Sequence, residues 1–408
     1  MKYIKRSFED KFLALNEEYS CLLLIGPRQV GKSTMLEHLM EGTDRNVVTL
    51  DNLEERKLAK NDPQLFLEMH PSPVLIDEIQ YAPELFSYIK IAIDKGAPAG
   101  SYWLTGSQAF HLMDLAQESL AGRTAILHMS ALSQSEMYSG KGTSPFTVDL
   151  AELMKRKQGL SSASATEMYQ RIWKGGMPGL ASGKYKDRDV FYSSYISTYI
   201  DRDVSDMVDG IDKLIFADFI RAAACRAGQM LNIHDIASDV GVSDETAKRW
   251  LTVLEKSEII FFLRPYSNNL LKRTIKTPKM YFFDTGLVAY LTKYVTPDIL
   301  MNGAINCAIL ENYVVSEIRK TYFNNAKEPI LHYYRDKDSN EIDLVMEANG
   351  ELHPLEIKKA SNPRSELIGA FKILDKASVP KGTGAILCLR EELSAINREN
   401  LIVPIWMI

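Results

Sequence analysis

The sequence predicts the α/β fold class, with a parallel-sheet domain followed by smaller modules, and three observations support this. The chain has 408 residues, enough for two to four domains at roughly 150 residues each. Its composition is ordinary for a globular protein, with 46% hydrophobic and 25% charged residues. Its first third alternates short apolar runs with helix-like segments, which is typical of a parallel sheet. We expect four units, at residues 1–140, 165–215, 216–290 and 291–408.

Composition and simple patterns exclude several classes of protein. The longest nearly unbroken apolar stretch is the C-terminal LIVPIWMI, far short of the ~20 residues that cross a bilayer, and it is typical of a buried edge strand. The basic start lacks an apolar core, so we expect no secretion signal, no membrane partner and a cytoplasmic location. Four cysteines without a CxxC pair predict buried, reduced thiols and no zinc site. The net charge of −5 excludes a uniformly basic nucleic-acid coat, although a local basic patch remains compatible with it.

The first predicted strand, CLLLI, leads into a glycine-rich loop that matches the pattern GxxxxGK[ST] and precedes a helix-like segment. The loop and the residue after it are Gly26, Pro27, Arg28, Gln29, Val30, Gly31, Lys32, Ser33 and Thr34. Glycines let backbone N–H groups wrap phosphates, and the helix N-terminus adds a favourable dipole. The pattern predicts a site for ATP or ADP with Mg²⁺, in which Lys32 reaches the β- and γ-phosphates and the hydroxyl of Ser33 binds the metal.

A second apolar strand, VLIDE, ends in two acids. Asp77 is placed to hold the Mg²⁺ shell, and Glu78 is placed to orient an attacking water. Because Glu78 directly follows Asp77, the chain differs from GTPase-type proteins, whose water-activating residue lies elsewhere. The set of Lys32, Ser33, Asp77 and Glu78 favours ATP hydrolysis over binding alone.

Seven segments along the chain resemble the prokaryotic AAA-type P-loop ATPases whose C-terminal half is a domain of unknown function. They are, in order, IKRSFEDKF, LLLIGPRQVGKST, VLIDEIQYAPELF, WLTGSQ, SLAGRT, KGGMPGL and TYIDRDV. The resemblance covers nearly the whole chain. It implies ATP binding and hydrolysis, a winged-helix module, and a C-terminal domain similar to PD-(D/E)XK nucleases. Separately, the helical spacing of Tyr192, Ile196 and Tyr199 predicts a helical lid or linker over residues 165–215.

The same resemblance implies roles for two further positions. In these ATPases a sensor residue ends the strand that corresponds to SYWLTGSQ, so Ser107 or Gln108 carries that role, with Thr105 as the weaker candidate. Arg123 corresponds to an arginine that approaches the γ-phosphate, either in cis or from a neighbouring subunit of a homo-oligomer. The alternatives are a strand-end cap for the first position and an ordinary surface arginine for the second.

Residues 233–283 combine two short helix-like segments with a basic stretch. The first segment ends at Gly241, and Ser243 predicts the N-cap of a second helix. We expect Ala247, Leu251 and Leu254 to face inward and Lys248, Arg249 and Thr252 to face outward. The stretch 259–283 has no acid and five basic residues, Arg264, Lys272, Arg273, Lys276 and Lys279. We therefore expect residues 264–279 to form a wing that contacts DNA phosphates. The alternative is a module that packs against another subunit or binds a peptide.

Two strands near the C-terminus, EIDLVME and HPLEIKK, are joined through Asn349-Gly350, which predicts an antiparallel hairpin. Residues two apart share a face of a strand, so the polar side chains of the two strands converge. Asp343, Glu356 and Lys358, with Glu311 on the preceding helix, are similar to the constellation of PD-(D/E)XK nucleases, in which carboxylates hold Mg²⁺.

The chemistry of this C-terminal cluster has more than one interpretation. An active nuclease is one, and a retained fold that serves as a binding platform is another; an exposed strand face of mixed charge is the third. The helix expected around 364–375 lacks the glutamine-containing motif of the exonuclease branch, which argues against catalysis. Three functions follow for the chain: an ATPase that remodels or translocates DNA or a partner, a slow nucleotide switch that gates a binding module, and an ATP-controlled nuclease. We place the hydrolysing ATPase first.

Overall fold

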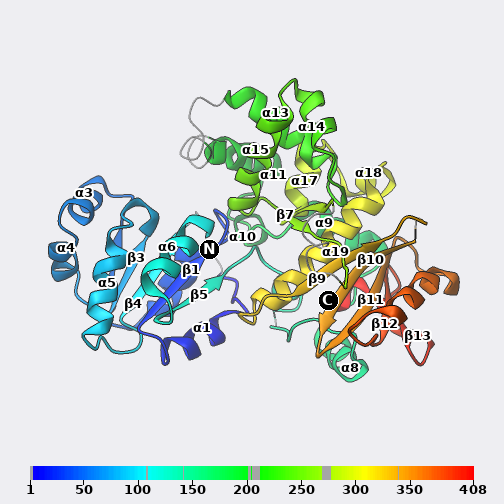
Figure 1. Cartoon of the computed structure of the whole chain (residues 1–408), viewed down its shortest axis with the longest axis horizontal. Coiled ribbons are helices and arrows are strands. Elements are labelled where there is room, and N and C mark those ends of the chain that lie inside the picture. The colour runs from blue at the N-terminus through cyan, green and yellow to red at the C-terminus, as the bar shows by residue number, and fades with distance from the viewer. Residues whose placement is uncertain are drawn as a thin grey trace.

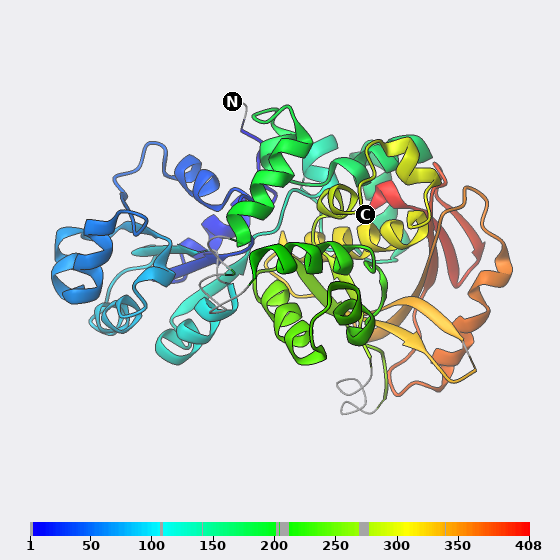
Figure 2. The ribbon, with the colours of Figure 1, turned by 90° about the horizontal axis from the view of Figure 1, so that it is seen from above.

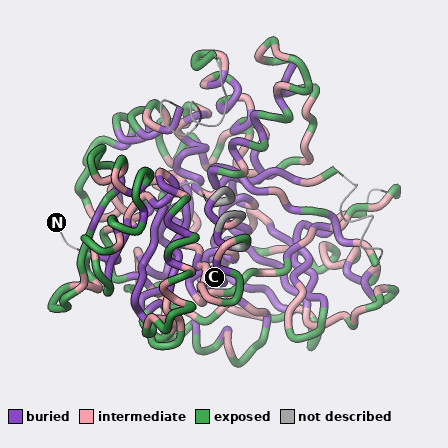
Figure 3. Tube along the Cα trace, turned by 60° about the vertical axis from the view of Figure 1, so that its left-hand side comes forward, coloured by how far each residue is buried: buried purple, intermediate pink, exposed green. Residues whose placement is uncertain are grey.

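The computed structural model describes residues 3–106, 109–140, 142–200, 204, 212–268, 277–338 and 340–408. These residues form three sheets. The N-terminal sheet with its helices lies at one end of the molecule, the C-terminal sheet lies at the other, and a helical part lies above them in Figure 1. The view from above keeps the two sheets at opposite ends (Figure 2). Buried segments gather inside the molecule and exposed ones surround them (Figure 3).

The N-terminal sheet is parallel throughout, which confirms the predicted α/β architecture. Its order is β2-β3-β4-β1-β5. The strands are β1 Cys21–Ile25, β2 Asn46–Thr49, β3 Val74–Asp77, β4 Tyr102–Gly106 and β5 Thr124–His128. Helices α1 Glu9–Asn16 and α2 Lys32–Met40 cover one face, and α5 Leu85–Asp94 and α6 Ala109–Leu120 cover the other. The pair α3 Leu53–Asn61 and α4 Pro63–Met69 lies between β2 and β3 in sequence. Since β4 separates β1 from β3, its carboxyl end lies between the glycine-rich loop and the Asp77-Glu78 pair.

A helical segment follows the sheet and leads to a small module. Its helices are α7 Gln134–Tyr138, α8 Leu150–Gly159, α9 Ala165–Lys174, α10 Pro178–Ala181 and α11 Arg188–Tyr199. The module contains α13 Lys213–Ala224, β6 Gln229–Met230, α14 Ile233–Val240, α15 Asp244–Lys256, β7 Ile260–Leu263 and β8 Lys279–Phe282. Its antiparallel sheet has the order β6-β8-β7.

The predicted helix pair in this module is confirmed. Gly241 follows α14 with a φ of 72°, and the Ser243 hydroxyl caps α15 by accepting the backbone N–H of Thr246 at 3.1 Å. The inward and outward faces of α15 are those that the sequence predicts: Ala247, Leu251 and Leu254 are buried, and Lys248, Arg249 and Thr252 are exposed.

The C-terminal part packs a mixed sheet against a long helix. The helices are α17 Thr285–Leu291, α18 Pro297–Asn302 and α19 Asn306–Phe323, and η3 Ser365–Lys376 is a 3₁₀ helix. The sheet has the order β13-β14-β12-β11-β10-β9. Its strands are β9 Ile330–Arg335, β10 Glu341–Ala348, β11 Glu351–Lys358, β12 Gly384–Cys388, β13 Ser394–Asn397 and β14 Asn400–Pro404. The predicted hairpin is confirmed, because β10 and β11 are antiparallel and Asn349 and Gly350 have φ values of 53° and 79°.

Two expectations from the sequence are wrong. The C-terminal apolar run is not an edge strand, because β14 pairs with β12 on one side and with the short polar strand β13 on the other, and Ile405–Met407 then form a 3₁₀ helix. All four cysteines are free, but only Cys21 and Cys388 are buried. Cys225 and Cys307 lie near helix ends and are exposed. Among the described residues, no helix combines the length and the apolar character that crossing a bilayer requires.

Candidate functional site

The glycine-rich loop turns tightly between β1 and α2 at two glycines. Gly26 has a φ of 149°, and a Cβ there would lie 2.1 Å from the carbonyl oxygen of Met129, just beyond β5. Gly31 has a φ of 93° and precedes the first residue of α2. Only glycine fits at a close backbone approach and adopts these angles readily. The loop therefore presents its backbone at the carboxyl end of the sheet, as a phosphate-binding loop requires.

Lys32 begins α2 and lies folded over this loop. Its Nζ donates hydrogen bonds to the carbonyl oxygens of Gly26 and Pro27, at 2.7 and 2.9 Å. Burial lowers the pKa of Lys32, while the carboxylates of Glu78, Glu258 and Asp77 oppose that shift. Phosphate oxygens are stronger acceptors than carbonyl oxygens, so this ammonium group is suited to move onto a bound phosphate.

Two oxygen ligands of the kind that Mg²⁺ prefers face each other beside the loop. The Ser33 hydroxyl donates to Asp77 Oδ1 at 3.2 Å. Burial, followed by repulsion from Glu78, raises the pKa of Asp77 to about 6. A nearby positive charge would reverse this shift. The pair therefore fits a magnesium ion, which usually takes one or two protein oxygens together with waters and phosphate oxygens.

Glu78 lies at the same edge of the sheet in an unusual conformation. Its φ and ψ angles are 58° and 46°, in the left-handed region that non-glycine residues adopt rarely and at a cost of order 1 kcal/mol. The Gln80 side-chain amide donates a hydrogen bond to the Glu78 carboxylate. Such strain is held by surrounding structure and concentrates at functional sites.

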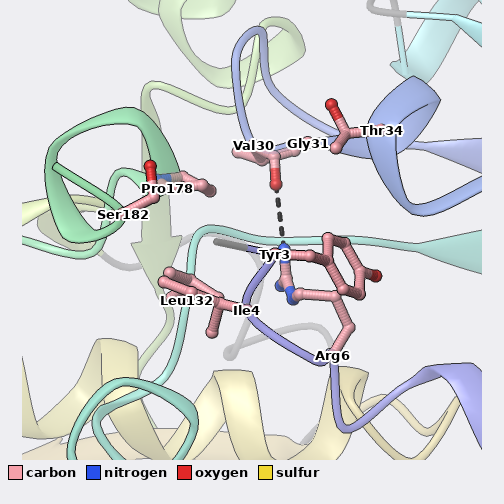
Figure 4. Close-up of a pocket in the computed structure, with 9 residues that line it drawn as sticks. All are labelled: Tyr3, Ile4, Arg6, Val30, Gly31, Thr34, Leu132, Pro178 and Ser182. Carbon is pink, nitrogen blue, oxygen red and sulfur yellow. Dashed lines mark hydrogen bonds between the residues drawn. The ribbon is translucent and has the colours of Figure 1, made fainter. Parts of the chain in front are cut away.

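A pocket with a volume of about 140 Å³ lies beside the loop, between the N-terminal segment and α10 (Figure 4). It is lined by Tyr3, Ile4, Arg6, Val30, Gly31, Thr34, Leu132, Pro178 and Ser182. Arg6 is buried, donates to the Val30 carbonyl at 2.9 Å and to the Ser130 carbonyl at 2.8 Å, and forms an ion pair with Glu136 at 3.2 Å. Val30, Gly31 and Thr34 belong to the glycine-rich loop and the first turn of α2, so the pocket lies directly beside the candidate phosphate-binding loop.

Sequence reasoning missed the N-terminal residues and Pro178 as members of this site. The available signal was the place of Ile4 and Arg6 in IKRSFEDKF and of Pro178 in KGGMPGL, two of the segments that carry the resemblance. Their contact with the loop bridges more than twenty residues of sequence, as in the Arg6–Val30 hydrogen bond. No local pattern predicts such a contact.

Arg123 does not reach the loop of its own chain. It directly precedes β5, whose first residue Thr124 pairs with Cys21, whereas the last residue His128 pairs with Ile25 beside the loop. Five strand residues at ~3.3 Å each separate the two edges of the sheet by roughly 16 Å. Arg123 instead pairs with Asp94 at 2.6 Å. The predicted approach in cis is therefore wrong for this structure, and only the approach from a neighbouring subunit stays a prediction.

The three candidates for the sensor residue differ in whether the structure describes them. Ser107 and Gln108 lie outside the described residues. Thr105, the weaker candidate, is fully buried inside β4. The Thr105 side chain therefore belongs to the interior of the N-terminal sheet.

In the C-terminal domain, three of the predicted polar residues converge. Lys358 Nζ lies 2.8 Å from Asp343 Oδ2 and 2.6 Å from Glu356 Oε2. The backbone N–H of Ile357 also donates to Asp343 Oδ2, at 2.9 Å. Burial and the neighbouring charge of Asp343 raise the pKa of Glu356 to about 8. These residues lie on β10 and β11, and the register shift between Ile342 and Val345 displaces Asp343 from regular pairing.

Glu311 on α19 has different partners. It accepts hydrogen bonds from Lys279 Nζ at 2.9 Å and from the Tyr281 hydroxyl at 2.6 Å. Lys279 also lies 2.7 Å from Glu341 Oε1. Burial alone would lower the pKa of Lys279, but Glu311 and Asp343 raise it above its usual value. Lys279 and Tyr281 come from β8, so the middle module supplies part of this C-terminal cluster.

This arrangement corrects two expectations. Within the part of the chain that the structure describes, no group of three or more His, Cys, Asp or Glu side chains is placed to hold a metal ion. The metal site expected from Glu311, Asp343 and Glu356, with Lys358 adjacent, is therefore not formed, because lysine ammonium groups occupy these carboxylates. Lys279 is only 4% exposed, so its ammonium group is not accessible to DNA phosphates in this structure.

Comparisons with known proteins support the N-terminal assignment. Residues 18–138 match the model of an AAA domain. Residues 165–298 and 307–408 each match a domain of unknown function (DUF8612 and DUF4143). Together with the loop geometry, the first match defines an AAA-type P-loop domain in this chain. The matches to the later regions assign no activity.

Two curated relatives and two solved structures are similar to longer parts of the chain. Uncharacterized proteins of Mycobacterium bovis and Mycobacterium tuberculosis are each 27% identical over 345 residues, which is 84% of this chain and 71% of theirs. A Walker-type ATPase of Pyrococcus abyssi is 16% identical with a TM-score of 0.46, over 71% of this chain and 96% of its own. The RuvB Holliday junction branch migration motor of Thermotoga maritima is 16% identical with a TM-score of 0.30, over 63% and 89%. The structural likenesses are partial, so the assignment rests on the AAA match and the loop.

Proposed function

We propose that this chain binds Mg-ATP at its glycine-rich loop, hydrolyses it, and couples the nucleotide state to DNA or a protein partner through its two later domains. The observation that carries the proposal is the meeting of Ser33 and Asp77 beside Lys32 and Glu78. Lys32 would hold the β- and γ-phosphates, and Ser33 and Asp77 would hold Mg²⁺. Glu78 would accept a proton from the attacking water.

The test is a titration of the full chain with Mg-ATP and Mg-ADP, followed by phosphate release with and without duplex and single-stranded DNA. Binding of both nucleotides and slow release of phosphate are expected. Stimulation by DNA supports remodelling or translocation, whereas slow turnover that DNA leaves unchanged supports the nucleotide switch. Absence of nucleotide binding would overturn the proposal.

The middle module is proposed to act as a winged helix that contacts DNA. Its order of helix, strand, two helices and two strands suits that role, and α15 presents Lys248 and Arg249 to solvent. Arg264 is exposed at the start of the basic segment 264–279. Lys272, Arg273 and Lys276 lie outside the described residues and remain candidate phosphate contacts.

The C-terminal domain is proposed to be a nuclease-like binding platform without cleavage activity. The lysine ammonium groups that contact Asp343, Glu356 and Glu311 support this alternative over an ATP-controlled nuclease. Linear, branched and single-stranded DNA should remain intact with Mg²⁺ or Mn²⁺ in every nucleotide state. Cleavage that Asp343→Ala abolishes, with ATPase activity retained, would instead establish the nuclease.

Arg123 is proposed to act from a neighbouring subunit. Its position at the far edge of the sheet supports a role in trans. ATPase activity per chain should then rise with protein concentration, and Arg123→Ala should remove this rise while leaving nucleotide binding intact. Activity independent of concentration would support the surface-arginine alternative.

A further inference from the structure

A buried carboxylate of the middle module faces the nucleotide site. Glu258 lies in the turn between α15 and β7, is 7% exposed, and has a φ of 55°, in the left-handed region. Its Oε1 lies 3.0 Å from Nδ1 of His128. His128 ends β5 and pairs in register with Ile25, the residue before Gly26. Glu258 is therefore held against the carboxyl edge of the parallel sheet, next to the phosphate-binding loop.

Neighbouring residues hold both partners of the Glu258–His128 contact in place. The ring of His128 stacks on Phe323 of α19, with centroids 5.5 Å apart. The backbone N–H of Glu258 donates to the carbonyl of Glu255 at 2.9 Å, which closes the turn after α15. The guanidinium group of Arg319, one turn before Phe323 on α19, lies over the Phe323 ring. Glu258 is thus surrounded by elements of all three sheet-bearing parts of the molecule.

The charges around Glu258 link it to the loop. Burial lowers the pKa of Lys32, and Glu258 is among the carboxylates that oppose this shift. Burial also lowers the pKa of Arg319, and Glu258 again opposes it, together with Glu328 and Glu255. Glu258 is therefore close enough to Lys32 for their charges to interact, as are Glu78 and Asp77.

We propose that Glu258 is a positioning residue that makes the site discriminate between ATP and ADP. The inference rests on the proposed function and adds a residue and a specificity to it. A γ-phosphate would take the ammonium of Lys32 and place more negative charge near Glu258, whereas ADP ends one phosphate earlier. Repulsion would then weaken the Glu258–His128 contact with ATP only. Since Glu258 joins α15 to β7, its displacement would pass the presence of the terminal phosphate to the middle module.

The test compares Glu258→Gln with wild type by calorimetry of the full chain, using ADP and a non-hydrolysable ATP analogue, each with Mg²⁺. The amide keeps the shape of the side chain and removes its charge. We expect the variant to bind the ATP analogue about tenfold more tightly and ADP nearly as before, because one unit charge close to a buried phosphate changes binding by about this factor. Glu255→Gln, three residues earlier in the last turn of α15, is the matched control and should leave the ratio of the two affinities unchanged.

Amide exchange of the wild type provides a second measurement that needs no variant. The turn at 256–259 should exchange faster with the ATP analogue than with ADP. Equal shifts of both affinities in Glu258→Gln, an identical effect of Glu255→Gln, or equal exchange with both nucleotides would each overturn the inference while leaving ATP binding established. Wild type that binds neither nucleotide would refute the proposed function, and the inference with it.

Discussion

The two charged clusters of this molecule differ in how their charges are balanced. At the edge of the parallel sheet, Lys32 rests on backbone carbonyls, and Asp77 has a raised pKa beside a serine hydroxyl. In the C-terminal domain, Asp343 and Glu356 share the ammonium of Lys358 at 2.8 and 2.6 Å. An added phosphate and a metal ion would supply stronger partners at the first cluster. At the second, Lys358 and a proton on Glu356, whose pKa is raised to about 8, already balance the two carboxyl groups. A cluster of acidic and basic side chains therefore indicates a ligand site only when those side chains have weak hydrogen-bond or ion-pair partners within the protein.

The largest effect expected at the first cluster comes from Lys32→Ala. Removing the ammonium deletes the charge-assisted hydrogen bonds to the phosphates, each worth about 1.5–3 kcal/mol. Nucleotide affinity should fall by at least about 100-fold, and ATP turnover should fall to background. Calorimetry and phosphate release measure both. Lys57→Ala, at an exposed position of α3, is the control and should behave like wild type. Unaltered turnover in Lys32→Ala would remove the loop from the mechanism.

Glu78→Gln should separate binding from chemistry. The amide cannot accept a proton from water, so turnover should fall by about 10²–10⁴-fold, the usual contribution of a general base. The affinity for Mg-ATP should stay close to wild type, because Glu78 is not assigned a phosphate contact. Single-turnover phosphate release together with equilibrium binding distinguishes the two quantities. A variant that loses binding and turnover equally would indicate that Glu78 shapes the site rather than activating water.

The internal balance of the second cluster predicts a stability effect instead of an activity effect. Lys279→Met leaves Glu311 and Glu341 without their shared cation, and removing one partner of a buried ion pair typically costs about 3–5 kcal/mol. Urea denaturation of the nucleotide-free chain should show an earlier transition. Lys372→Met, at an exposed position of η3, should not shift it. Asp77→Asn should leave stability unchanged or slightly raised, since it removes a desolvated charge. Equal shifts of the urea transition in Lys279→Met and Asp77→Asn would contradict the proposed difference between the two clusters.

A smaller effect of pH is expected from Glu356. Its pKa in the folded chain, about 8, lies above its usual value of 4.5, so the folded state holds a proton that the unfolded state releases. This stabilisation is fully present below about pH 4.5 and is lost as the pH rises through about 8. Glu356→Gln keeps the group neutral and should therefore reduce the loss of melting temperature between pH 6 and pH 9. A variant with the same pH dependence as wild type would assign that loss to other groups.

Local patterns in the sequence predicted the parts of the molecule that depend on neighbours in the chain. The loop 26–33, the acids that end β3, and the hairpin at Asn349-Gly350 each follow from a few consecutive residues, because turn geometry and strand alternation are local properties. The distance of Arg123 from the glycine-rich loop is also predictable from the local sequence. Arg123 precedes its strand, and ligands of parallel sheets bind at the carboxyl ends of strands.

The remaining errors come from contacts that bridge distant residues. The sequence groups Lys279 with a basic stretch, because five positive charges without an acid are typical of a DNA-binding surface. In the structure its ammonium pairs with Glu311, 32 residues further along the chain, and with Glu341. A charge count describes net charge, and a side chain's partner depends on how the strands and helices pack. The same limit hid the contact between His128 and Glu258, which are 130 residues apart.

The smallest predicted effect concerns DNA, and the corrected position of Lys279 sharpens it. With Lys279 buried, the basic segment 264–279 offers four phosphate contacts at most: Arg264, Lys272, Arg273 and Lys276. The contribution of this segment to the slope of log affinity against log salt should then not exceed about 3.6, at ~0.9 for each neutralised phosphate.

Neutralising Lys272 and Arg273 together should lower this slope by roughly 2. Lys248→Ala with Arg249→Ala on α15 is the informative comparison, because it tests whether the helix also contacts the phosphates. Fluorescence anisotropy with a labelled duplex over a series of salt concentrations gives the slope for the wild type and for each variant. If the wild-type affinity does not depend on salt, or no binding is detected at low salt, the module's partner is a protein. If the Lys279→Met variant lowers the slope by about 0.9, the value for one phosphate contact, then Lys279 leaves Glu311 and Glu341 when DNA binds. The second cluster would then be a ligand site as well, and the contrast between the two clusters would fail.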